Sequence, residues 1–151
     1  MAEVRLEEHG FILASPEVAY RCIADYRQHH PNFLPPAFSN FRVEAGGYGA
    51  GTVISFEGKM AGRARQFRMA VSEPEPGRVL VESDTRSSMV TRFVVTPEGE
   101  GSRVRFETRW TAAPGVGGFF ERLFAPMLMR RLYRDELTRL DMYARGLSRA
   151  S

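Results

Sequence analysis

The feature that most constrains the fold is a period of two in the hydrophobic pattern, which persists from residue 38 to residue 112. Alternation of this kind is typical of β-strands with one covered and one wet face. Breaks rich in glycine, proline and polar residues divide the stretch into six expected strands, at 38–45, 51–61, 63–73, 78–84, 88–96 and 102–112. Because a parallel crossover needs a much longer connection than these breaks provide, we predict antiparallel neighbours.

A strand and two short helices are predicted before this sheet. Residues 3–13 alternate like a further strand. Ser15-Pro16-Glu17 then has the residue types of a helix start, namely a capping hydroxyl, a proline suited to the first turn and an acidic side chain that complements the dipole. Asp25 is expected to cap a second short helix, which ends by Pro35-Pro36.

A long helix is predicted after the sheet. From Phe119 to about Leu147, apolar residues recur at helical spacing. Pro126 lies inside this pattern, so we expect either a kink there or a start of the regular helix at that point. The order of elements predicts an α+β fold, with a seven-stranded curved antiparallel sheet around a long C-terminal helix. One helix cannot fill the apolar lining of such a sheet, so a cavity is expected.

Length and composition exclude several classes of protein. The 151 residues are expected to form a single domain, residues 1–151. The lone Cys22 excludes an intramolecular disulfide and any CxxC-type zinc or redox site. No run approaches the roughly 18 apolar residues of an integral membrane segment, and no secretory signal begins the chain, so a cytoplasmic protein is expected. The net charge of +3 is too weak to argue for nucleic acid as a partner.

Several segments resemble the START-like (SRPBCC) superfamily, in particular its polyketide cyclase/dehydrase-like branch. They are residues 12–18, the Asp25-Tyr26 pair followed by Pro31 and Leu34-Pro35, residues 46–52, residues 73–80 and residues 136–140. The resemblance implies a helix-grip fold around a deep hydrophobic cavity that binds lipids, sterols, polyketides, hormones or aromatic compounds. A minority of members catalyse cyclisation or dehydration. Because the superfamily shares no catalytic triad, it implies no catalytic residue, and neither a cofactor nor a metal is expected.

The alternation indicates which side chains would line this cavity. On the strands, Val79 and Val81 are expected to face inward together with the main candidates. The candidate lining residues are Phe33, Ile54, Phe56, Phe67, Met69, Phe93, Phe106, Trp110, Phe120, Phe124 and Met127. Aromatic and methionine side chains on a concave sheet can form an adaptable apolar pocket, or they can simply fill the core.

Three polar residues on the inward parity are candidate anchors for a ligand: Glu8, Arg65 and Thr108. A buried charge has to be paired or neutralised. A Glu8–Arg65 ion pair would satisfy this requirement, and so would contact between Arg65 and a ligand carboxylate or phenolate. The alternative is that both charges lie at strand ends in solvent, or that a bulge reverses the parity.

Two further patterns could carry chemistry. His29-His30 follows Asp25, so one histidine could relay a proton or bind a metal, although capping or a surface role is the simpler interpretation. The glycines at 47, 49 and 51 superficially suggest a phosphate loop. Such a loop needs a helix after it, whereas a strand is predicted from Thr52 onward, which favours a hairpin turn.

We therefore expect a protein that binds or carries a small hydrophobic or amphipathic ligand. The main alternative is a polyketide cyclase or dehydratase that uses a cavity acid or base such as Glu8, His30 or Tyr26. A third hypothesis is an interaction module whose Arg130, Arg131 and Arg134 dock on an acidic partner or membrane surface. The sequence leaves open whether the protein is a monomer or a homodimer.

Overall fold

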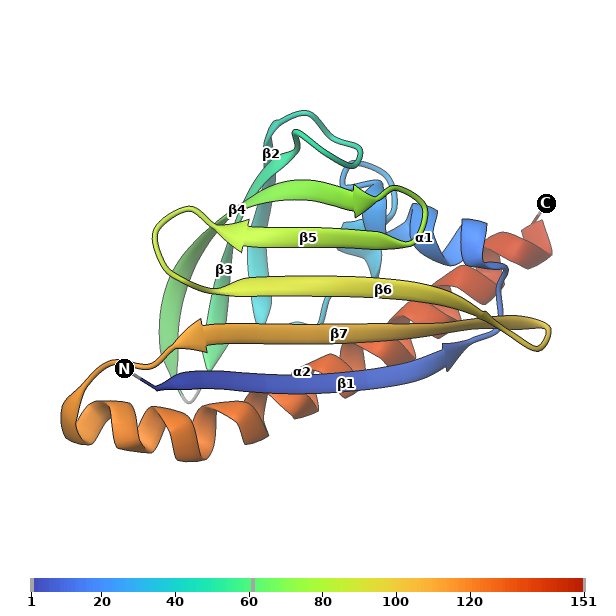
Figure 1. Cartoon of the computed structure of the whole chain (residues 1–151). Coiled ribbons are helices and arrows are strands. Elements are labelled where there is room, and N and C mark those ends of the chain that lie inside the picture. Colours follow the sequence, from blue (N-terminus) through green and yellow to red (C-terminus); the bar gives the residue numbers. More distant parts are fainter. Residues whose placement is uncertain (1, 61, 151) are drawn as a thin grey trace.

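The computed structural model describes residues 2–60 and 62–150, without the side chains of Met60, Phe119, Phe120 and Ala150. Figure 1 shows the elements. They are β1 (Glu3–Ile12), α1 (Pro16–Ala24), the 3-10 helix η1 (His30–Phe33), β2 (Phe38–Ala45), β3 (Val53–Met60), β4 (Arg63–Glu75), β5 (Val79–Asp84), β6 (Val90–Glu98), β7 (Gly101–Thr111) and α2 (Gly115–Ala150).

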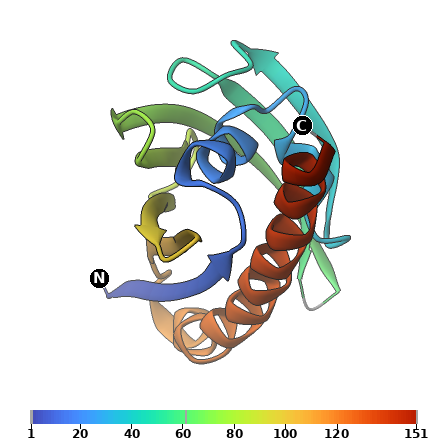
Figure 2. The same cartoon turned by 90° about the vertical axis from the view of Figure 1, so that its right-hand side faces the viewer.

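All seven strands form one antiparallel sheet in the order β1-β7-β6-β5-β4-β3-β2. Seen end-on, the sheet curls so that the strands and α2 enclose a common interior (Figure 2). The predicted fold class, a curved antiparallel sheet around a long C-terminal helix, is therefore confirmed. Each predicted strand lies within a few residues of an observed one.

The predicted start of the first helix is confirmed in detail. The Ser15 hydroxyl accepts a hydrogen bond from the Val18 backbone N–H at 3.2 Å, and Pro16 occupies the first turn. Asp25 caps the turn that follows, since its carboxylate accepts the backbone N–H groups of Arg27 and Gln28. This turn leads into η1, so the predicted second short helix is a 3-10 helix.

The long helix α2 is continuous from Gly115 to Ala150, with Pro126 inside it. The expectation that the regular helix starts at Pro126 is therefore wrong, whereas the expected change of direction is present. Figure 1 shows the first turns running at an angle to the rest of the helix. Proline has no N–H to donate and its ring clashes with the preceding turn, which accounts for a bend at this point.

The inward parity predicted for β5 is wrong. Leu80, Glu82 and Asp84 are buried on the inner face, and Val81 faces outward with the half-buried Ser83. Directly opposite residues of an antiparallel pair share a face, and Glu82 lies opposite the inward Thr91. Three consecutive apolar residues, 79–81, hide the alternation, and a register shift separates β4 from β5 between Ser72 and Glu75.

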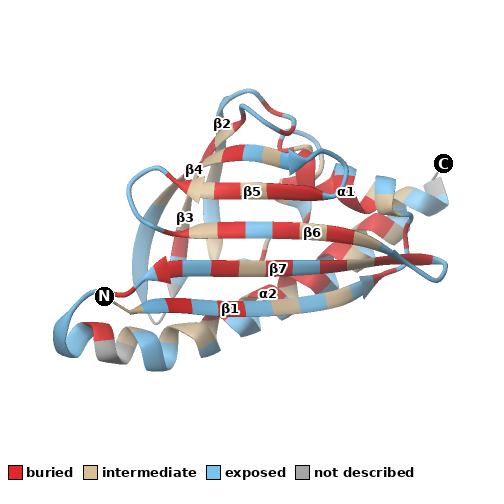
Figure 3. Cartoon of the chain, in the orientation of Figure 1, coloured by how far each residue is buried: buried red, intermediate tan, exposed pale blue. Residues whose placement is uncertain are grey.

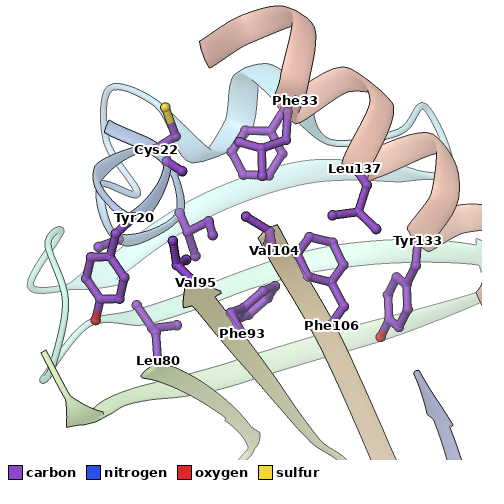
Figure 4. Close-up of a cluster of buried hydrophobic side chains, with 14 of the residues drawn as sticks. Tyr20, Cys22, Phe33, Leu80, Phe93, Val95, Val104, Phe106, Tyr133 and Leu137 are labelled. Atoms are coloured by element: carbon purple, nitrogen blue, oxygen red, sulfur yellow. The ribbon is translucent and has the colours of Figure 1, made fainter. Parts of the chain in front are cut away.

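The packed core lies between the sheet, α1 and the second half of α2. Figure 3 shows buried and exposed residues alternating along the strands, with a buried stripe on α2. Figure 4 shows Phe33, Phe106 and Leu137 meeting in this core. The stripe on α2 consists of Met129, Tyr133, Glu136, Leu137, Leu140 and Ala144.

We expect Leu140→Ala to reduce the free energy of unfolding by about 2–5 kcal/mol, because it leaves a cavity at a fully buried position. Met142→Ala is the matched control, since Met142 is 69% exposed on the same helix. Denaturant unfolding of both variants measures the difference. Equal losses would show that the inward stripe of α2 does not hold the helix on the sheet.

A cavity between the sheet and the C-terminal helix

A cavity of about 480 Å³ lies between the curved sheet and α2. This volume is within the roughly 300–1,000 Å³ range of sites that enclose small molecules. The sheet contributes mostly apolar side chains, because inward positions recur at every second residue of β3, β4, β6 and β7. They are Ile54, Phe56, Phe67, Met69, Phe93 and Trp110, together with Met89 and Thr91.

The opposite wall and the end of the cavity come from α2 and the segment after α1. On α2 the lining residues are Glu121, Ala125, Met129, Leu132, Tyr133 and Glu136, which follow one another at helical spacing. Glu121 also joins α2 to the end of β7, since its carboxylate accepts the Trp110 indole N–H at 2.5 Å. His30, Leu34, Phe38 and Phe41 close the cavity beside η1 and β2.

The cavity reaches the surface at the hairpin between β3 and β4. Arg63, Ala64 and Arg65 line it there and are exposed. Arg65 is half exposed, its guanidinium forms an ion pair with Asp84 at 3.1 Å, and it lies over the Phe67 ring at 4.7 Å. The predicted Arg65 anchor is thus a residue of the cavity mouth, and its charge is already paired.

Six of the eleven predicted lining residues lie on the cavity wall: Ile54, Phe56, Phe67, Met69, Phe93 and Trp110. Phe33 and Phe106 do not line it, because they are fully buried in the packed core beside it (Figure 4). Phe33 and Phe106 therefore fill the core, which is the alternative that the sequence left open for the candidate lining residues.

The prediction is wrong for Phe124 and Met127, which are 48% and 52% exposed. The inward face of α2 passes through Ala125 and Met129. Phe124 and Met127 lie on either side of this face. Phe120, the remaining predicted residue, lies outside the described side chains.

The predicted Glu8–Arg65 pair does not form. Sheet order explains this, because three strands separate β1 from β4. Glu8 instead forms an ion pair with Arg134 of α2 at 3.1 Å, so it joins β1 to the helix and does not line the cavity. Thr108 is buried behind the cavity wall and bridges the hydroxyls of Thr91 and Tyr133, at 2.8 Å and 2.5 Å.

The closed end of the cavity contains a carboxyl group on β5. Glu82 is 6% exposed, and one of its oxygens accepts a hydrogen bond from the Tyr26 hydroxyl at 2.7 Å. Burial raises the pKa of Glu82 to about 7, although the hydrogen bond from Tyr26 acts in the opposite direction. Glu82 is therefore able to gain or lose a proton near neutral pH.

A second carboxyl group comes from α2. Glu136 is 4% exposed on the cavity wall. No hydrogen bond or ion pair joins its carboxyl group to any other residue that the structure describes. Burial raises its pKa well above the ordinary value, and the negative charge of Glu82 raises it further. The two carboxyl groups thus interact across the cavity.

His30 supplies the third polar group at the closed end. Its Nδ1 lies 2.6 Å from the Ile23 carbonyl oxygen, which can only accept, so Nδ1 carries the proton. The ring stacks on Tyr26 with centroids 4.6 Å apart, and burial lowers the pKa of His30 to about 4. The histidine is neutral at pH 7, and its Nε2 is an acceptor.

Glu82 and Glu136 were missed by sequence reasoning for identifiable reasons. The wrong parity on β5 placed Glu82 outside. Glu136 lies among charged residues in the sequence, between Arg134 and Arg139, which favours an exposed position. Glu136 follows Tyr133 by three residues and precedes Leu140 by four. This helical spacing from two buried residues is the signal that places Glu136 on the inward face.

The remaining chemical candidates have structural roles. The Nδ1 of His29 lies 2.7 Å from the Tyr143 hydroxyl, which joins the segment before η1 to α2. The glycines at 47, 49 and 51 all have positive φ in the turn before β3, as expected for a hairpin. Among the described side chains, no group of three or more His, Cys, Asp or Glu could hold a metal ion.

Sequence comparison assigns the family. The model of the family described as "Polyketide cyclase / dehydrase and lipid transport" matches residues 3–145. The chain belongs to this family. No curated protein sequence matches it.

Solved structures show how widely this family fold recurs. The KanY protein, an NMR solution structure, is 35% identical with a TM-score of 0.85, over 97% of this chain and 100% of that chain. TTHA0849 from Thermus thermophilus is 24% identical with a TM-score of 0.76, over 97% and 99% of the two chains. The Zhui aromatase/cyclase from Streptomyces sp. R1128 is 16% identical with a TM-score of 0.76, over 95% and 94%.

The predicted resemblance to the START-like superfamily is confirmed by the family match and by a START superfamily protein from Mycobacterium smegmatis. That structure is 15% identical with a TM-score of 0.73, over 91% of this chain and 97% of that chain. Within residues 2–60 and 62–150, no helix has the length and hydrophobicity that a transmembrane segment requires.

We expect Glu82→Gln to become more stable relative to the parent as the pH rises from 4.5 to above 7. The Glu82 carboxyl of the parent has an ordinary pKa of 4.5 when unfolded and about 7 when folded, so folding favours its protonated form. The folded parent therefore loses stability as the pH rises from 4.5 through 7. At about 1.4 kcal/mol per pKa unit, the relative gain is about 3 kcal/mol at most. Denaturant unfolding at several pH values measures it.

Glu100→Gln is the control for this experiment, because Glu100 is exposed in the turn before β7. Its difference from the parent should be nearly constant over the same pH range. A constant difference for Glu82→Gln as well would show that folding does not change the ionisation of Glu82.

Proposed function

We propose that this protein binds a small hydrophobic or amphipathic molecule in the cavity between the sheet and α2. The observation that supports this best is the cavity itself, about 480 Å³ with aromatic and methionine side chains on its walls and exposed lining residues beside Arg65. An apolar molecule gains by leaving water for such a lining. Family membership supports the same class of ligand. A cytoplasmic location, expected from the sequence, is part of the proposal.

Filling the cavity tests this function. Ala125 lies on the helical wall, so Ala125→Phe should occupy part of the volume and weaken binding of butylbenzene at least tenfold. Leu123→Phe is the matched control, because Leu123 is 54% exposed on the outer side of the same helix. Quenching or enhancement of fluorescence from Trp110, the single tryptophan, reports occupancy.

Equal affinities of the parent and Ala125→Phe would place binding elsewhere, and absence of binding by the parent would refute the function. Native mass spectrometry of protein purified without denaturation adds an independent measurement. A bound molecule that is present in the parent and lost in Ala125→Phe would identify the ligand class directly.

A second candidate function is catalysis of a cyclisation or dehydration, which the family description includes. The observation that favours it is the pair of groups at the closed end. Glu82, with a pKa of about 7, can deliver or accept a proton at neutral pH, and His30 presents a neutral ring nitrogen. General acid–base catalysis requires groups of this kind within reach of the substrate.

Incubation with a short poly-β-ketone thioester tests this candidate. Ring closure or loss of water, followed by mass spectrometry, should occur with the parent and be at least a hundredfold slower with Glu82→Gln, since removal of a general acid or base costs a factor of about 10²–10⁴. Glu100→Gln should retain the parent rate. Conversion by the parent no faster than in buffer alone would refute catalysis on this substrate class and leave the binding function standing.

A further inference from the structure

The polar groups at the closed end of the cavity can all accept hydrogen bonds, the two carboxyls most fully when they are ionised. Glu82 has one oxygen bonded to Tyr26 and further lone pairs available. Glu136 has no partner among the described residues, although it is 4% exposed. His30 donates through Nδ1 to Ile23, which leaves Nε2 as an acceptor. A cationic donor would complement all three groups, because a positive charge beside the two carboxyls favours their ionised, accepting form.

Charge narrows the ligand chemistry further. Two carboxyl groups line the same mostly apolar cavity and interact electrostatically, and a buried negative charge is costly unless a cation pairs with it. The arginines of the cavity lining, Arg63 and Arg65, are exposed at the mouth, and Arg65 is already paired with Asp84. An ammonium group would bring both a positive charge and N–H donors to the closed end.

The surrounding rings favour the same group. The His30 ring has the Phe41 centroid 6.3 Å away and the Phe93 centroid 6.1 Å away. Aromatic faces attract an organic cation, and the attraction is stronger when the cation leaves water. The aromatic walls nearer the mouth would cover an apolar body attached to that cation.

We propose that the closed end of this cavity selects an apolar or aromatic molecule that carries a cationic amine, with the amine between Glu82 and Glu136 and the apolar body directed toward the mouth. This inference rests on the proposed binding function and specifies its ligand class. A carboxylic acid of the same shape is disfavoured at the closed end, because its charge would have the same sign as the two glutamates.

The groups that face Glu136 set the pH range of this selection. They are Glu82 from β5, His30 and Tyr26 from the segment after α1, Tyr133 from α2 itself, and the Arg65–Asp84 pair, Arg63 and Glu121 nearer the mouth. The negative charge of Asp135, the neighbouring residue of α2, also raises the pKa of Glu136. The two tyrosines and His30 are uncharged at neutral pH. A bound ammonium group favours the ionised form of both carboxyls and lowers their pKa values. Protonation of the carboxyls at low pH should therefore weaken the selection.

Three probes of one shape test the inference: phenylbutylamine, butylbenzene and phenylbutyric acid. Titration of the parent at pH 7.5, followed by Trp110 fluorescence, should show the amine binding at least tenfold more tightly than butylbenzene and the acid more weakly than the amine. Glu136→Gln should reduce the amine preference to less than threefold and leave butylbenzene affinity unchanged. The same loss of preference is expected for the parent at pH 5.

Glu100→Gln is the control, because it removes a carboxyl charge from the exposed turn before β7, outside the cavity lining. It should keep the full amine preference. Equal binding of amine and butylbenzene, tightest binding of the acid, or an unchanged preference in Glu136→Gln would each overturn the inference, while the proposed binding function would stand. Binding of none of the three probes would overturn both.

Discussion

A single helix has to cover the concave side of a seven-stranded sheet, and most features of this molecule depend on that mismatch. The second half of α2 packs closely against β1 and α1, with Leu137, Leu140 and Ala144 in the seam. The helix cannot at the same time fill the curve formed by β3, β4 and β5. Those strands keep inward apolar side chains that face a space, so the cavity follows from the number of strands and their curvature.

The bend in α2 increases this effect. Figure 1 shows the first turns of α2 at an angle to the rest of the helix and extending beyond the end of β1, and Pro126 lies inside this helix. Their apolar side chains, Leu123, Phe124 and Met127, consequently remain exposed, whereas the turns after Pro126 approach the sheet. The Trp110–Glu121 hydrogen bond joins this part of the helix to β7. The opening of the cavity lies between this segment and the β3–β4 hairpin.

The fold could be predicted from the sequence because its signals are local. The Ser15 cap, the glycines of the turn before β3 and the alternation of residues 103–110 each depend on a few neighbouring residues, and all three are as expected. The site depends on which face of its strand or helix each side chain occupies, and the local sequence pattern determines this less well. An error of one residue on β5, where residues 79–81 are all apolar, moved Glu82 from the cavity to the surface. Pairing with Thr91 resolves the parity, but strand register is a property of the assembled sheet.

The positions of these carboxyl groups also determine how the cavity can discriminate among ligands. Elsewhere in the interior, polar atoms satisfy one another, as in the hydroxyl chain from Thr91 through Thr108 to Tyr133. Glu82, Glu136 and His30 keep further acceptor atoms on the cavity wall that no residue of the described protein pairs. A purely apolar ligand that displaced their solvation would leave them unpaired, at a cost of about 1–3 kcal/mol for each group and more for a charge. Apolar burial therefore supplies affinity for any ligand of suitable size, whereas unpaired acceptors penalise every ligand that brings no donor.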